Sequence, residues 1–121
     1  SMDLSLPDDV PVYPGAVPTS GYETGYLTTV IYHVNEDSAV VHDWHNVDAN
    51  IPPVWEGPVY PAITMNDAGD VISRAQYFYQ TMDYNPNPNA RSGRQILYTI
   101  AEADEGGTTI AIGYLNYEQD L

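Results

Sequence analysis

His42 and His45 are the residues whose type and spacing could most simply support chemistry. They stand three positions apart in the sequence, so they share one face if this segment is helical. Two imidazoles at this spacing can bind one metal ion, to which Asp43, Asp48 or Glu36 would add oxygen ligands. The alternative is that both histidines are solvent-facing residues of a helix that packs through its other face. A small metal-binding protein is therefore one hypothesis, although the sequence fixes no third ligand.

Acidic turns are the second group of residues with possible chemistry. Residues 66–70 and 104–105 have the residue types of calcium loops, but neither has the spacing or the number of oxygen ligands of such a loop. Asp and Gly are also the residues that turns require for conformational reasons. We therefore expect no bound calcium and no cofactor.

Motifs of catalysis are missing from the sequence. None of the serines in the body of the chain lies in a nucleophile-elbow pattern. Gly106 and Gly107 lie in a predicted hairpin, whereas a phosphate-binding glycine loop is followed by a helix. Paired carboxylates occur throughout, so their presence discriminates nothing. We expect that this protein is not an enzyme.

Tyrosine is the prevailing aromatic residue, with 11 Tyr against two Trp and one Phe. A Tyr side chain has an apolar body and a polar tip, so a Tyr-rich sheet can be half exposed. Tyr77 and Tyr79 fall on one face of a predicted strand. If a helix covers the opposite face, these two rings could form a platform for a carbohydrate or a protein partner. The alternative is cross-strand packing in the core.

The charge balance is extreme, with 17 Asp and Glu against three Arg and no Lys, for a net charge of −14. The missing basic footprint argues against direct binding to nucleic acid and against attraction to anionic membranes. One explanation is adaptation to high salt, where carboxylates keep the surface hydrated and salt screens their repulsion. The other is mimicry of DNA by an acidic inhibitor of a nucleic-acid-binding protein. The carboxylates occur in almost every segment, which favours salt adaptation.

The length of 121 residues suggests one domain with a core of its own. No cysteine is present, and no apolar run is long enough to insert this domain in a membrane. Residues 1–2, Ser-Met, resemble a cloning scar, which is compatible with an upstream signal or anchor. We predict an extended Pro-rich segment over residues 1–20 and a single α+β domain over residues 21–121.

The C-terminal half predicts a run of strands at residues 71–82, 96–103 and 108–115. Residues 71–82 also fit a helix, but their Tyr-Phe-Tyr content and the turn before them favour a strand. In the last hairpin, a three-residue loop at residues 105–107 would pair Ile100 with Ile112. This register puts the large side chains on one face, and a shift of one residue would split them between faces.

The N-terminal half predicts a strand over residues 27–33 and a short helix over residues 39–50. We expect Trp44 to anchor that helix, together with Val40, Val41 and Val47. A proline-broken linker should follow over residues 54–61, with a short strand at residues 62–65. The expected fold is therefore an antiparallel meander of about four or five strands with one short helix packed on a face.

The opening stretch, residues 6–16, reads Leu-Pro-Asp-Asp-Val-Pro-Val-Tyr-Pro-Gly-Ala. It resembles the start of a group of small prokaryotic surface and lipoprotein domains, which open with a Leu-Pro-x-x-x-Pro-x-x-Pro-Gly-Ala signature. The order of later segments is also similar, with a strand, a short helix, Trp55 and a terminal hairpin that contains Gly-Gly-Thr-Thr. The helix departs from the pattern, because residues 42–45 are His-Asp-Trp-His where such domains more often have Phe-Tyr.

The resemblance implies an extracytoplasmic location, usually behind a lipid anchor or tether, and it transfers no activity. The sequence therefore predicts a non-catalytic binding or interaction module of a surface protein or lipoprotein, adapted to salt. Its partner would be a protein or a carbohydrate. The alternatives are the DNA-mimicking inhibitor and the metal-binding protein described above.

Overall fold

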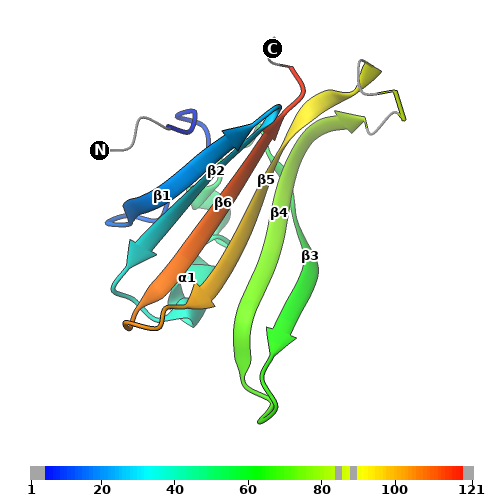
Figure 1. The fold of residues 1–121 in the computed structure, drawn as a ribbon. Helices are drawn as coiled ribbons and strands as arrows, with labels where there is room; N and C mark the ends of the chain where they lie inside the picture. Colours follow the sequence, from blue (N-terminus) through cyan, green and yellow to red (C-terminus); the bar gives the residue numbers. More distant parts are fainter. Residues whose placement is uncertain (1–4, 84–85, 88–89, 119–121) are drawn as a thin grey trace.

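The computed structural model describes residues 5–83, 86–87 and 90–118. Within these ranges the chain forms one antiparallel sheet of six strands, in the order β1-β2-β6-β5-β4-β3 (Figure 1). The strands are β1 (Val17–Thr24), β2 (Leu27–Val34), β3 (Glu56–Met65), β4 (Val71–Asp83), β5 (Ser92–Glu102) and β6 (Thr108–Asn116). One α-helix, α1 (Ser38–Trp44), and a 3₁₀ turn (Asp48–Asn50) lie between β2 and β3. The α+β prediction is confirmed, but four or five strands were too few.

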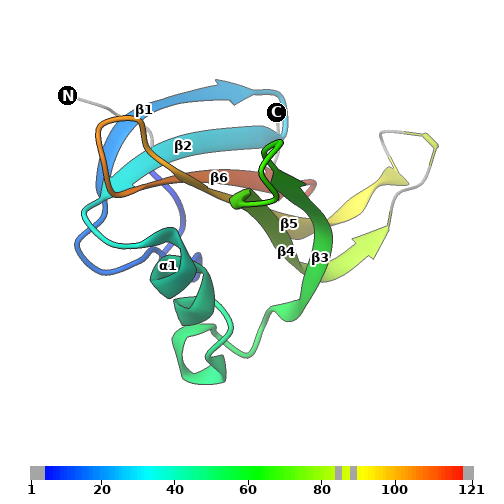
Figure 2. The same ribbon diagram turned by 90° about the horizontal axis from the view of Figure 1, so that it is seen from below.

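The sheet is curved, and α1 and the N-terminal segment lie on one side of it, here called the covered face (Figure 2). Alternation along the strands sends every second side chain to this face. The most deeply buried apolar residues there are each at most 1% exposed: Val30, Phe78, Ile96, Tyr98, Ile100, Ile110 and Ile112. The opposite side, here called the outer face, has no covering element in the part of the chain that the structure describes.

The hairpin between β5 and β6 has the predicted faces but not the predicted loop. Ile100 pairs with Ile110, so the register is displaced by two residues from the expected one. The loop runs over five residues, from Ala103 to Gly107, and the Ala103 amide donates to the Gly107 carbonyl at 3.1 Å. Gly106 and Gly107 both have positive φ, 94° and 76°, which permits the longer loop. A shift of two residues leaves every side chain on its predicted face.

Helix α1 ends at Trp44, well before the predicted end at residue 50. Val41 in the helix and His45 at its C-cap are both 0% exposed, and they are four residues apart on one helical stripe. Val40 and Val47 are 45% and 49% exposed, and Trp44 is only partly buried. The expected stripe was therefore displaced by one residue, and Trp44 is not the buried anchor.

The N-terminal segment belongs to the core, whereas a course over the surface was expected. Val10 is 4% exposed, and the Tyr98 hydroxyl donates to the Pro11 carbonyl at 2.5 Å. Residues 17–20, which were assigned to the extended segment, are part of β1. The proline-rich stretch thus forms part of the cover over the sheet.

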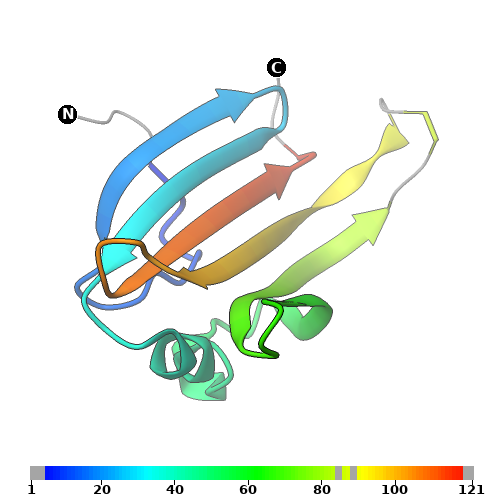
Figure 3. The same cartoon turned by 60° about the horizontal axis from the view of Figure 1, so that its bottom comes forward.

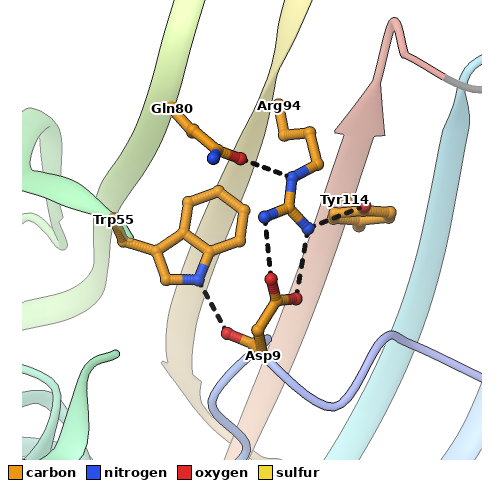
Figure 4. Close-up of polar contacts among 5 residues, drawn as sticks. All are labelled: Asp9, Trp55, Gln80, Arg94 and Tyr114. Atoms are coloured by element: carbon orange, nitrogen blue, oxygen red, sulfur yellow. Dashed lines mark hydrogen bonds and ion pairs between the residues drawn. The ribbon is translucent and has the colours of Figure 1, made fainter. Parts of the chain in front are cut away.

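An ion pair between Asp9 and Arg94 holds this segment in place (Figure 4). The guanidinium binds both carboxylate oxygens, at 2.7 and 3.1 Å, and its Nε donates to Gln80 at 2.7 Å. The Trp55 ring lies 4.7 Å from the guanidinium carbon, and its indole nitrogen donates to the Asp9 carbonyl at 2.7 Å. The Asp9 carboxylate and the Tyr114 hydroxyl raise the Arg94 pKa, so this cation is permanent.

Strand β3 starts at Glu56, inside the stretch predicted to be a linker. Its ladder with β4 is irregular, with register shifts between Glu56 and Val59 and again before Ala62. Proline is tolerated there because β3 is an edge strand, which needs hydrogen bonds on one side only. Residues 71–82 form a strand, so the prediction of a strand instead of a helix is confirmed.

Candidate functional site

A row of side chains crosses the whole outer face at the middle of the sheet. The strand registers place these residues next to one another, from one edge strand to the other: Val59, Tyr77, Leu97, Gly113, Thr29 and Tyr22. Bulky residues stand at both ends of the row, and the smallest residue lies between them. The centre of the outer face is therefore hollow.

This hollow, here called the outer trough, has a volume of about 390 Å³. It is lined by Tyr22, Leu27, Thr29, Gln95, Leu97, Thr99, Ala111, Gly113 and Leu115. A methyl group on Gly113 would meet side-chain carbons of Leu27 and Leu97 at 3.8 and 3.9 Å, so the glycine keeps the floor low between two leucines. Among the residues that the structure describes, no charged side chain lines the trough, although the chain has a net charge of −14.

Tyr77 and Tyr79, the candidate partner-binding residues, lie on the outer face beside the trough. Their ring centroids are 6.3 Å apart, and both side chains are partly buried. Tyr77 is paired with Leu97, which forms part of the trough wall. The two rings therefore extend the apolar surface of the trough toward β3.

The two candidate metal ligands have different surroundings. The buried ring of His45 packs on Tyr98 at 4.4 Å between centroids, and its Nδ1 donates to the Val41 carbonyl at 2.8 Å. Burial lowers the His45 pKa to about 4, so the ring is neutral near pH 7. The His42 ring is more accessible and lies beside Tyr60, with centroids 6.0 Å apart. Among the described residues, no three His, Asp or Glu side chains are grouped as a metal site would require.

A polar cavity of about 750 Å³ lies at one end of the sheet, and it was not predicted from the sequence. It is enclosed by the start of α1, the β3–β4 turn and the β5–β6 turn, which Figure 3 shows at the same end of the molecule. We call it the turn cavity. Arg74 lines it together with three acidic residues: Asp37, Asp70 and Glu102. These three carboxylates are far apart in the sequence, and the fold brings them to one cavity.

Sequence reasoning missed Arg74 because a single arginine in a strand carries no motif. The only signal in the sequence was the rarity of cations, since the chain has three Arg and no Lys against 17 acidic residues. The outer trough was missed because small residues on a strand face leave no periodic signal of their own.

Comparisons with known proteins give no identification. No protein-family model, no curated protein and no solved structure matches this chain. No helix in the described ranges is long and apolar enough to cross a membrane.

Proposed function

We propose that this protein is a non-catalytic binding module whose outer trough docks a polypeptide partner with apolar side chains at its centre and basic residues around them. The observation that carries the proposal is the absence of charge from the trough of a strongly acidic chain. Apolar surface that a folded protein leaves exposed in one patch commonly marks an interaction site.

The side chains around the trough support a polypeptide as its occupant. Tyr22 is 55% exposed and Leu97 is 37% exposed, so apolar area is available for burial. Tyrosine is enriched in the centres of protein interfaces, where charged residues are depleted. Burying each such side chain would stabilise a complex by about 25 cal/mol for every Å² of apolar area removed from water.

The negative charge around the trough favours a partner with basic residues at its rim. Glu56 is exposed on the edge strand β3, where it pairs with Tyr79 of the outer face, and the net charge of −14 makes the surrounding potential negative. Basic residues around an apolar centre would therefore be attracted to the trough, and this raises the association rate more than the affinity. Anionic partners would be repelled.

The location outside the cytoplasm is also a proposal, and it rests on the resemblance of residues 6–16 to the opening of surface domains. Salt adaptation fits such a location, because an exported protein meets the ionic strength of the surroundings. Fractionation of the source cells tests this point, since recovery of the native protein in the cytoplasmic fraction would contradict it.

Peptide titration followed by NMR tests the binding proposal. The probe is an amphipathic peptide of Leu and Lys, and the matched peptides carry Ser in place of Leu or Glu in place of Lys. We expect the Leu/Lys peptide to shift the amides of Leu97, Gly113 and Thr29, and both matched peptides to bind at least about tenfold more weakly.

Two variants locate the contact. Leu97→Asp places a charge in the trough and should abolish peptide binding. Ile63→Asp is the control, because Ile63 is 58% exposed on β3 and does not line the trough. Equal binding by the two variants would reject the trough as the site. Shifts of the same amides by cello-oligosaccharides, without any by the peptide, would reject a polypeptide as its occupant.

A further inference from the structure

The turn cavity is at the end of the sheet and shares no lining residue with the outer trough, so it requires an explanation of its own. Its three walls are formed by Asp37 and Ser38 before and at the start of α1, by residues 66–70, and by residues 103–107. Its volume of about 750 Å³ lies within the range of small-molecule sites, which is about 300–1,000 Å³. The lining is mainly polar.

Local hydrogen bonds hold the β3–β4 wall in shape. The Asn66 side-chain oxygen accepts from the amides of Ala68 and Asp70, both at 3.0 Å. The Asn66 amide donates to the Asp70 carbonyl, also at 3.0 Å. The orientation of this turn is thus set before any ligand arrives, which lowers the entropy cost of binding.

The other two walls are joined to each other. The Thr108 hydroxyl donates to the Glu36 carbonyl at 2.6 Å, which ties the start of β6 to the segment before α1. Gly107 packs so closely on Val34 that an added methyl group would lie 2.5 Å from its carbonyl oxygen. His33 Nε2 bonds the Gly106 carbonyl at 2.8 Å. The segment before α1 and the β5–β6 turn, which are distant in sequence, are therefore held together at the edge of the cavity.

Arg74 is the cation of this cavity, and its guanidinium makes no hydrogen bond or ion pair with the described residues. Asp37, Asp70 and Glu102 line the same cavity, yet none of them lies within ion-pair distance of its guanidinium. The positive charge of Arg74 also reaches His42, whose pKa it lowers together with burial. By contrast, Arg94 binds both oxygens of Asp9. The cavity thus presents one separated cation and several carboxylates.

We propose that the turn cavity binds a small zwitterion, such as a free amino acid, with its carboxylate on Arg74 and its ammonium group among Asp37, Asp70 and Glu102. A simple anion would be attracted by Arg74 but repelled by the three carboxylates and the net charge. A simple cation would meet the carboxylates without using Arg74. A zwitterion is neutral overall, and it makes charge-assisted hydrogen bonds at both ends.

The experiment compares glycine with acetate and methylammonium, which are its two charged halves. Each compound, followed by a panel of L-amino acids, is titrated into the ¹⁵N-labelled protein while the amides of Asp70, Ala103 and Gly106 are observed by NMR. We expect saturable shifts with amino acids, and at least about tenfold weaker binding of acetate and methylammonium. Equal binding of acetate would indicate a plain anion site, and equal binding of methylammonium would indicate a plain acidic cluster. Either result, or no binding by any amino acid, overturns the proposal.

Variants assign the contact to Arg74. Arg74→Gln should weaken amino-acid binding by about tenfold or more, because it removes a charge-assisted contact. Arg74→Lys keeps the charge, so its affinity for amino acids should lie between those of the unaltered protein and Arg74→Gln. Arg91→Gln is the matched control, since Arg91 lies over the Tyr117 ring, 5.8 Å from its centre, and does not line the cavity. If Arg74→Gln binds like the unaltered protein, or loses binding no more than Arg91→Gln does, the assignment is wrong. Peptide binding at the outer trough should be unchanged in all three, so the two proposals fail separately.

Discussion

The two faces of the sheet are made by the same strands, yet they differ in burial and in the reason for their apolar residues. On the covered face, Ile96, Tyr98 and Ile100 of β5 are each at most 1% exposed beneath α1 and the N-terminal segment. On the outer face, Leu97 of the same strand is 37% exposed, and its neighbour Thr99 lines a trough without charge. Burial explains the apolar residues of the first face, because a core must exclude water.

Burial cannot explain the second face. A chain with 17 acidic residues could solubilise its outer face with carboxylates, as it does in its turns. Instead, Leu27, Leu97 and Leu115 stand around a floor of Ala111 and Gly113. The apolar residues of the covered face therefore stabilise the fold, whereas the absence of charge on the outer face has a separate cause. Substitutions on the two faces should have different effects.

The largest difference should come from equivalent truncations on the two faces. Ile112 is 0% exposed on the covered face, so Ile112→Ala should lower the free energy of unfolding by about 2–5 kcal/mol. Leu97→Ala should cost less than about 1 kcal/mol, because Leu97 is already partly in water. Urea denaturation of both variants measures the two values. Similar losses would show that the outer face is packed like a core.

The covered face should also respond to acid through His45. Its pKa is about 4 in the folded protein, below the ordinary value of 6.5, because it is buried beside Tyr98 and close to the His42 charge. As pH falls below 6.5, His45 becomes protonated in the unfolded chain, whereas in the folded protein it stays neutral until about pH 4. The free energy of unfolding should therefore fall by about 3 kcal/mol across this window through His45 alone.

His45→Gln isolates that contribution from those of the carboxylates. The slope of stability against pH between 6.5 and 4 should be shallower in the variant than in the unaltered protein. Chemical denaturation at several pH values gives both slopes. Identical slopes would mean that His45 is protonated in the folded state like an exposed histidine.

A smaller effect should come from detaching the cover. Asp9→Asn removes the charge that binds Arg94, while Gln80 and Tyr114 remain as partners of the guanidinium. We expect a loss of about 1–2 kcal/mol and faster hydrogen exchange of the Val10 amide. Asp8→Asn is the control, because Asp8 is an exposed neighbour. If the two variants are equally stable, the ion pair does not hold the segment.

The smallest and most gradual effect should come from salt. The melting temperature should rise steadily as NaCl goes from low millimolar to molar, first through screening of the −14 charge, which acts over about 10 Å at 0.1 M. Salts excluded from the surface then strengthen apolar burial further. A melting temperature that stays flat over this range contradicts salt adaptation.

The features that could be predicted from sequence are those with a period of two. Alternation assigned the faces of β4, β5 and β6 correctly, and it did so even though the loop at residues 103–107 was mistaken by two residues. Strand β1 was missed because Pro18, Ser20 and Gly21 have low strand propensity, and the strand forms by pairing with β2.

Contacts between distant residues left no local signal at all. Asp9 and Arg94 are 85 positions apart, and nothing near either residue identifies the other. The helix stripe was misjudged because Val40, Val41, Trp44 and His45 allow two stripes one residue apart, and only the position of Tyr98 selects Val41 and His45.

The pairing of β2 with β6 has a consequence for the order of events during synthesis. Leu27 pairs with Leu115, so the β1–β2 hairpin, which is made first, cannot gain this neighbour until β6 has left the ribosome. Until then β2 has a free edge. Asp9 likewise has no ion-pair partner until Arg94 has been synthesised. Such long-range closure makes folding slow and leaves the apolar side of the nascent sheet open. The dense negative charge that keeps nascent chains apart would be most useful during that interval.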